Sequence, residues 1–133
     1  MPIPWSQDLS VNIKEIDEQH KHFLGLLNKT YDVFYKLKKE EVPQLVKELH
    51  DYTQTHFETE EKYFDKFNYE FTNDHKKEHR ELEAKVEEFN RKIKSEGVEA
   101  IGELVEFLED WLVEHMANHD KKYTKCFNEH GLF

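Results

Sequence analysis

The fold of this chain is decided by residues 50–79, which read HDYTQTHFETEEKYFDKFNYEFTNDHKKEH. His56 and Glu60 stand four residues apart, as do His75 and His79, so each pair shares one face of a helix. In each segment the pair continues a stripe of apolar side chains that recurs every three or four residues. The stretch therefore predicts two helices whose buried faces both carry potential metal ligands.

Two further segments show the same spacing of apolar side chains, and the connections between segments are short. Because short connections make neighbouring helices antiparallel, the sequence predicts an all-α fold, an up-down-up-down antiparallel four-helix bundle. The expected helices cover about residues 17–39, 43–68, 73–94 and 98–118. An extended N-terminal arm (1–16) precedes them, and a short C-terminal helical tail (119–133) follows. Asp17 is the expected N-cap of the first helix.

The composition describes a single acidic helical domain. The 133 residues suit one domain, 1–133, and only four Gly and three Pro interrupt a sequence rich in helix-forming residues. The net charge is −10 and no basic stripe is visible. We therefore expect no nucleic acid and no anionic membrane surface among its partners.

The sequence favours a cytoplasmic protein. Its N-terminus reads MPIPWSQD, which lacks the basic stretch and apolar run of a signal peptide. No apolar run approaches membrane-spanning length. The single cysteine, Cys126, cannot form an internal disulfide, so a reducing compartment and a packed thiol are expected. The short segment at 36–42 carries no insertion for subunit contacts, so we expect a monomer or a weak homo-oligomer.

Seven potential metal ligands fall on the predicted buried stripes. They are His20, His56, Glu60, His75, His79, His115 and Asp120. An antiparallel bundle gathers them at one end, because they lie at helix starts and at the ends of the next helices. Burying five imidazoles and two carboxylates is very costly without compensation. A pair of metal ions is the simplest compensation, because a carboxylate can bridge two cations whereas a neutral imidazole binds one.

The residue types limit which metals the site can hold, but the spacing leaves the identity of one ligand undecided. A structural zinc site needs four ligands, usually with Cys, and a calcium or magnesium site is not dominated by His. Mixed imidazole and carboxylate suits iron or manganese, although zinc and copper also accept imidazole. His119 stands four residues after His115, whereas Asp120 stands five residues after it, about 140° away on an ideal helix. A change of winding after Asn118 would bring Asp120 inward, so spacing alone does not choose between them.

Four motifs of this chain resemble those of the hemerythrins, most closely the single-domain bacterial branch. They are IDEQHK (16–21), HFETE (56–60), HKKEH (75–79) and WLVEHMANHD (111–120). The resemblance covers the chain from Trp5 to about Cys126 and includes every ligand position named above. It favours Asp120 over His119 as the last ligand. One departure is Asn12, which stands where the arm of such proteins is expected to carry Gly.

The resemblance implies a non-haem centre of two iron ions bridged by an oxo or hydroxo group. One iron would be held by His75, His79 and His115, and the other by His20 and His56. The second iron would keep one open coordination position, and Glu60 and Asp120 would bridge the two. Members of the family bind O2 reversibly at the open iron. We therefore expect reversible O2 binding for storage, delivery or sensing, without haem and without catalysis.

Reversible binding needs a pocket that excludes water and protons. The apolar residues expected to line it are Phe23, Leu24, Phe57, Trp111, Leu112 and Met116. Leu112 stands one turn before His115, where it would cover the open position. No Glu stands three residues before any His, so the Glu-x-x-His motifs of ferritin-like di-iron proteins are missing from the sequence.

Other functions are compatible with parts of the pattern. A di-iron enzyme acting on peroxide or nitric oxide would use the same ligands. HKKEH also fits the H-x-x-E-H pattern of inverted zinc peptidases, with Glu78 as the base between His75 and His79, but the other ligands would then be surplus. Iron storage, or sensing with a separate output protein, is a third alternative. The histidines expected outside the site, at the surface or partly packed, are His22, His50 and His130.

Overall fold

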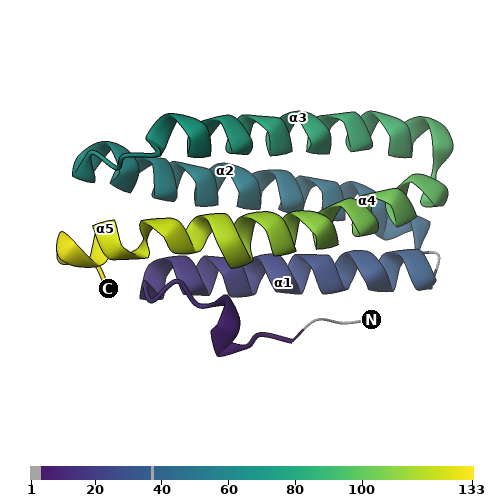
Figure 1. The fold of residues 1–133 in the computed structure, drawn as a ribbon. Coiled ribbons are helices and arrows are strands. Elements are labelled where there is room, and N and C mark those ends of the chain that lie inside the picture. Colours follow the sequence, from purple (N-terminus) through teal and green to yellow (C-terminus); the bar gives the residue numbers. More distant parts are fainter. Residues whose placement is uncertain (1–3, 37) are drawn as a thin grey trace.

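The computed structural model describes residues 4–36 and 38–133, except for the side chains of Val98, Leu112, Val113, Ala117 and His119. Four long helices lie side by side (Figure 1). They are α1 (Lys14–Tyr35), α2 (Val42–Phe67), α3 (Thr72–Glu96) and α4 (Val98–Trp111). Each helix runs antiparallel to the next one, and α4 also packs against α1, which closes the bundle. The predicted all-α four-helix bundle is confirmed.

Shorter helical segments complete the chain. Two 3-10 turns, η1 (Gln7–Leu9) and η2 (Lys39–Glu41), precede α1 and α2. After Trp111 the fourth helix continues as a π-helix, η3 (Leu112–His119), and then as a 3-10 turn, η4 (Asp120–Tyr123). The chain ends in α5 (Thr124–Glu129). One uninterrupted helix was expected over 98–118, so the change to π-helical winding begins earlier than the sequence suggested.

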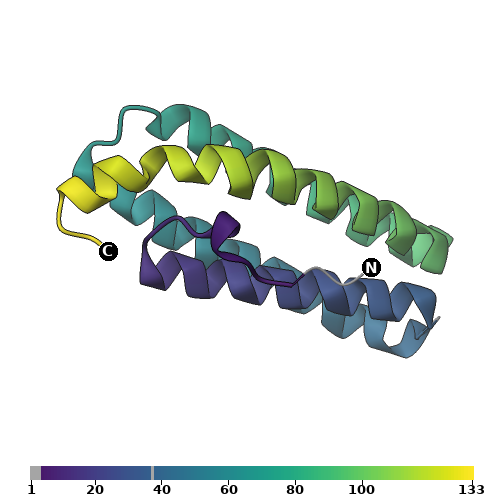
Figure 2. The ribbon, with the colours of Figure 1, turned by 60° about the horizontal axis from the view of Figure 1, so that its bottom comes forward.

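The arm is tied to the bundle by the side chain that was expected to cap the first helix. α1 begins at Lys14, with Ile13 at the N-cap, so the prediction of Asp17 as N-cap is wrong. The Asp17 carboxylate instead accepts hydrogen bonds from the Ser10 hydroxyl at 2.5 Å and from the Val11 N–H at 2.8 Å. These bonds fold the arm back along α1 (Figure 2).

The tight turn of the arm is made by Asn12, whose φ of 56° lies in the left-handed region. Glycine adopts this conformation without cost, and Asn is among the few other residues that tolerate it. Asn12 therefore makes the turn at the position where the resemblance to the hemerythrins led us to expect Gly.

The apolar core has two parts, and the polar cluster lies between them. The larger part follows the bundle and includes Phe57 and Leu108, and the smaller part lies at the α5 end and includes Phe64 and Phe127. The Phe57 ring stacks on the imidazole of His79 with centroids 3.8 Å apart, and Phe64 approaches His75 at 4.7 Å. Aromatic rings of both parts therefore shield the buried imidazoles from water.

Within the described part of the chain, no helix has the length and apolar character needed to cross a membrane.

The left-handed turn at Asn12 yields a stability prediction. Asn12→Val should destabilise the protein by about 1–2 kcal/mol, because a β-branched side chain clashes with the backbone in this region. Asn12→Gly should keep or slightly raise the stability. Denaturant unfolding measures the free energy of unfolding of both variants. Equal stability of the Asn12→Val variant and the wild type would show that the turn is not constrained.

Candidate metal centre

The seven predicted ligands converge at the end of the bundle where α1 and α3 begin and where α2 and the fourth helix end. All are buried, and His75, the most exposed, has only 4% of its surface accessible. The antiparallel order of the helices explains the convergence, because it places a helix start beside the end of the next helix.

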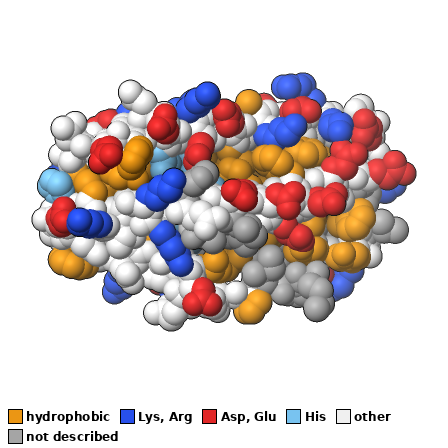
Figure 3. All heavy atoms as spheres, in the orientation of Figure 1, with side chains coloured by type: hydrophobic (Ala, Val, Ile, Leu, Met, Phe, Trp, Pro, Cys, Tyr) orange, Lys and Arg blue, Asp and Glu red, His pale blue; other side chains and the backbone are white. Residues whose placement is uncertain are grey.

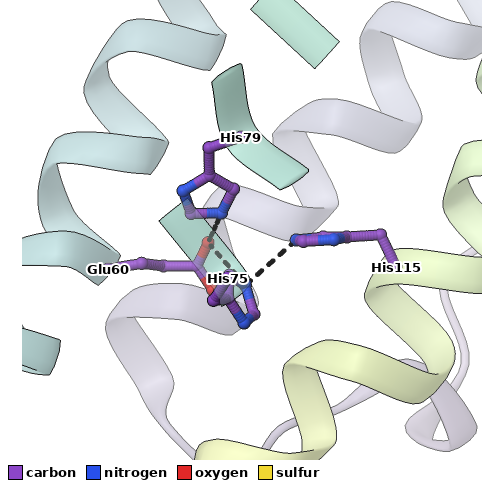
Figure 4. Close-up of side chains that lie close together, drawn as sticks. All are labelled: Glu60, His75, His79 and His115. Atoms are coloured by element: carbon purple, nitrogen blue, oxygen red, sulfur yellow. Dashed lines mark hydrogen bonds and ion pairs between the residues drawn. The ribbon is translucent and has the colours of Figure 1, made fainter. Parts of the chain in front are cut away.

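One group consists of Glu60, His75, His79 and His115, each of which offers a ligand atom within 4.8 Å of the others. In Figure 4 the imidazoles of α3 and of the fourth helix point toward the Glu60 carboxylate of α2. The Nε2 atoms of His75 and His115 are 3.1 Å apart, and Nε2 of His79 is 3.1 Å from Oε1 of Glu60. Three imidazole nitrogens and one carboxylate oxygen thus face a common point.

The second group consists of His20, His56, Glu60 and Asp120, again with ligand atoms within 4.8 Å of one another. Nε2 of His56 lies 3.0 Å from Oε1 of Glu60, and Nε2 of His20 lies 3.1 Å from Oδ2 of Asp120. This group has two imidazoles where the first group has three.

The two carboxylates lie between the groups. Glu60 belongs to both of them. Asp120 turns its Oδ1 toward the first group, 2.9 Å from Nε2 of His75 and 2.9 Å from Nε2 of His115. Its Oδ2 faces His20 of the second group. Each carboxylate therefore has the placement that a ligand shared by two cations requires.

The π-helical winding of η3 brings Asp120 to the centre. The Asp120 N–H donates to the carbonyl of His115, five residues earlier. An i→i+5 bond puts residue i+5 one turn above residue i, whereas i+4 takes that place in an α-helix. The π-helix thus places Asp120 over His115. The alternative, His119, lies outside the residues whose side chains are described.

Unpaired buried atoms show that these residues fit a pair of cations. Among the described residues, polar atoms of five of these side chains have no hydrogen-bond partner: both nitrogens of His20, Nε2 of His56 and of His79, and both oxygens of Glu60 and Asp120. A buried polar group without a partner costs about 1–3 kcal/mol, and a buried charge costs more. Imidazole nitrogens and carboxylate oxygens that face each other without hydrogen-bond geometry are suited to share a cation.

The pKa shifts of the ion-free protein also favour a bound cation. Burial raises the pKa of Glu60 and of Asp120, but the adjacent imidazoles outweigh it and hold both values well below the usual range. Burial lowers the pKa of His115, but Asp120, Glu78 and Glu60 outweigh it and raise the value to about 10. The two buried carboxylates therefore attract positive charge, from a proton or from a metal ion.

Three imidazoles are oriented by partners on their outer nitrogens. Nδ1 of His56 donates to the Gln19 amide oxygen at 2.7 Å. Nδ1 of His79 donates to Glu61 at 2.9 Å, and Nδ1 of His115 donates to Glu78 at 2.8 Å. These bonds place a proton on Nδ1, so that Nε2 is the atom that would bind a metal.

The sequence alone did not identify these three partners. Gln19 and Glu61 were not singled out, and Glu78 was considered only as the base of a peptidase. A signal did exist, since each of the three stands next to a candidate ligand in the sequence. Adjacent residues on a helix point in different directions, however, so adjacency alone cannot show which imidazole is contacted.

Most of the predicted pocket residues are buried beside the cluster. Phe23, Leu24, Phe57 and Met116 are each at most 3% exposed. Trp111 is half-buried, stacks on His115 with centroids 4.2 Å apart, and contacts the ring of Phe23. The side chain of Leu112 lies outside the described residues.

Surface grooves reach two ligands of the cluster, one at His115 and the other at His75. A groove of about 300 Å³ between α3 and the fourth helix is lined by Leu82, Phe107 and Trp111 and reaches His115. Hydrophobic side chains flanked by acidic ones mark this face in Figure 3.

Two buried tyrosines beside the cluster, Tyr52 and Tyr123, were not predicted as pocket residues.

The fold and this cluster define a four-helix bundle with a candidate two-metal centre. A family model described as the hemerythrin HHE cation binding domain matches residues 11–126. The chain therefore belongs to the hemerythrin family.

Bacteriohemerythrins of two bacteria align with this chain over most of their length. The chain is 31% identical to a bacteriohemerythrin of Clostridium acetobutylicum over 124 residues, which cover 90% of this chain and 96% of that one. It is 29% identical to a bacteriohemerythrin of Methylococcus capsulatus over 121 residues, 91% and 92% of the two chains. A crystal structure of wild-type hemerythrin superimposes with a TM-score of 0.84 at 27% identity, covering 95% of this chain and 98% of that chain.

The hydrogen bond between His115 and the Glu78 carboxylate yields a prediction of metal affinity. Glu78→Gln should weaken metal binding about 10–100-fold, because loss of such a partner makes the imidazole a poorer ligand. Glu81→Gln, an exposed neighbour in the same groove, is the matched control and should have no effect. Chelator competition on metal-loaded protein measures both affinities, and equal affinities would contradict the assigned role of Glu78.

The raised pKa of His115 yields a pH prediction. Because this value is about 10, the imidazole carries a proton near neutral pH in the ion-free protein and must lose it to bind a metal. Metal affinity should therefore rise with pH up to about 10, and Co²⁺ binding at about pH 8 should release protons. Calorimetry in buffers of different ionisation enthalpy counts the protons, and an absence of release would contradict the prediction.

Proposed function

We propose that this protein binds O2 reversibly at two iron ions held by His20, His56, Glu60, His75, His79, His115 and Asp120. It would serve oxygen storage, delivery or sensing in the cytoplasm, as a monomer or a weak homo-oligomer. The observation that carries the proposal is the unequal division of the ligands. Three imidazoles belong to one group and two to the other, while both carboxylates lie between the groups.

An unequal division leaves an incomplete coordination shell. With the carboxylates shared, the group of His20 and His56 contributes one imidazole fewer than its neighbour. A small ligand can bind at a position that the protein does not fill, as at open catalytic metal sites. An iron pair bound here would supply the electrons that O2 takes up on binding and returns on release.

The side chains around the cluster keep water and protons away. Phe23 and Met116 are fully buried, and Phe57 covers one face of His79. A dry pocket slows the side reactions that would turn bound oxygen into products. The described residues contain no buried carboxylic acid besides Glu60 and Asp120. Without a spare acid to deliver a proton, the pocket favours binding over cleavage, so we propose a carrier or sensor and not an enzyme.

The position of Glu78 argues against the peptidase alternative. Its carboxylate is bound to Nδ1 of His115 on the outer side of the cluster. A peptidase base would instead stand over the metal-bound water on the open side. Glu78 thus supports a ligand and is not free to take a proton from a substrate water.

Oxygen titration tests the proposal. Protein reconstituted with iron and reduced without air should bind one O2 per pair of irons, with an absorption band that bleaches when O2 is removed and returns with air. A control with Glu60→Gln, which removes the charge of a shared carboxylate, should lose most of the bound iron.

Two results would contradict the proposed function. Steady consumption of peroxide or nitric oxide, without a stable O2 complex, would identify an enzyme. Failure to bind two irons per chain would remove the basis for O2 binding.

A further inference from the structure

Three aromatic rings form a parallel stack from the surface to the second ligand group. The ring of His22, which is exposed, stacks on Tyr52 with centroids 5.6 Å apart and planes 10° apart. Tyr52 stacks in turn on His56 with centroids 5.5 Å apart and planes 8° apart. His56 is 1% exposed. The stack thus connects solvent to a candidate metal ligand through one intervening residue.

The outer end of the stack lies in an open groove. His22 and Tyr52 line a groove of about 590 Å³ between α1 and α2. Gln19, which accepts the hydrogen bond of His56, lines the same groove. A small molecule or a protein edge in the groove can touch His22 while the ligand cluster itself stays inaccessible.

From this stack we propose that His22 and Tyr52 carry electrons from a one-electron donor in the α1–α2 groove to the His20–His56 half of the centre. The inference rests on the proposed function. A centre with both irons ferric must be reduced before it can bind O2 again, and its burial keeps donors out of contact. Each donor molecule gives up one electron and one iron passes from ferric to ferrous, so two such steps restore the pair. No bond of His22 or Tyr52 forms or breaks.

Tyr52 acts as a bridge and is not itself oxidised. Among the described residues its hydroxyl has no hydrogen-bond partner, and it is buried. A phenol that loses an electron must also lose its proton, and no acceptor stands there to take it. The ring therefore couples His22 to His56 while the hydroxyl keeps its proton.

A second stack, formed by Trp111 on His115, also approaches the surface. The carboxylates near this stack make it a less suitable path for an electron. Adding an electron to a metal site is harder when its ligands are bonded to anions. The outer nitrogens of His115 and His79 contact the carboxylates of Glu78 and Glu61, whereas His56 contacts the neutral amide of Gln19. The His56 side therefore accepts an electron more readily.

Reduction kinetics test the path. Diferric protein is mixed with hexaammineruthenium(II), a one-electron donor, and reduction is followed by absorbance in a stopped-flow instrument. His22→Ala and Tyr52→Leu should each slow reduction by about tenfold. Tyr52→Phe keeps the ring and should react like wild type. His50→Ala is the matched control, because His50 is also an exposed histidine and lies outside the stack.

A tethered donor sharpens the test. In one protein, a photoactive ruthenium complex is attached to His22, and His50, His119 and His130 are replaced by Gln. In a second protein, the complex is attached to His50, and His22, His119 and His130 are replaced by Gln. Tyr52→Leu should slow flash-induced electron transfer about tenfold from the His22 label and leave the His50 label unchanged within about twofold.

The outcomes separate this inference from the proposed function. If the iron protein binds O2 but His22→Ala and Tyr52→Leu are reduced at the wild-type rate, the path is wrong and the function stands. If Trp111→Leu slows reduction while His22→Ala and Tyr52→Leu do not, electrons enter through the other stack and the inference is overturned. If no iron centre forms, both proposals fail. His22→Ala changes an exposed side chain, so it remains informative even where Tyr52→Leu loosens the fold.

Discussion

The structure depends on how seven polar side chains can be buried together at one end of an apolar bundle. Removing two carboxylates from water costs several kcal/mol per charge even after the protein relaxes. Their imidazole neighbours reduce this cost only by taking up protons, as the raised pKa of His115 indicates. Two divalent cations would satisfy the same oxygens and nitrogens at once. The aromatic rings, the π-helical segment and the outer hydrogen bonds all serve to hold this arrangement.

Much of the fold was predictable because helices reveal their buried faces through spacing. His56 and Glu60 continue an apolar stripe in register, and antiparallel topology brings them to His75 and His79. Spacing could not choose between Asp120 and His119, because that choice depends on a π-helix that begins at Leu112. A π-helix is stabilised by its tertiary surroundings and leaves no clear sequence pattern.

Local preference was misleading where a tertiary contact was stronger. Asp17 has the residue type of an N-cap, yet it bonds to Ser10 and Val11 of the arm. Gln19 and Tyr52 give little sign of their positions in the sequence, since a polar residue next to His20 and an aromatic one on an apolar stripe are both ordinary. Their importance appears only when α1 and α2 lie side by side and bring Gln19 and Tyr52 against His56.

Anomalous diffraction at the iron absorption edge tests the central claim most directly. Crystals of iron-loaded protein should show two peaks, one among His75, His79 and His115 and the other beside His20 and His56. Glu60 and Asp120 should each contact both peaks. A single peak, or seven side chains that pack together without any ion in crystals grown with excess iron, would contradict the account.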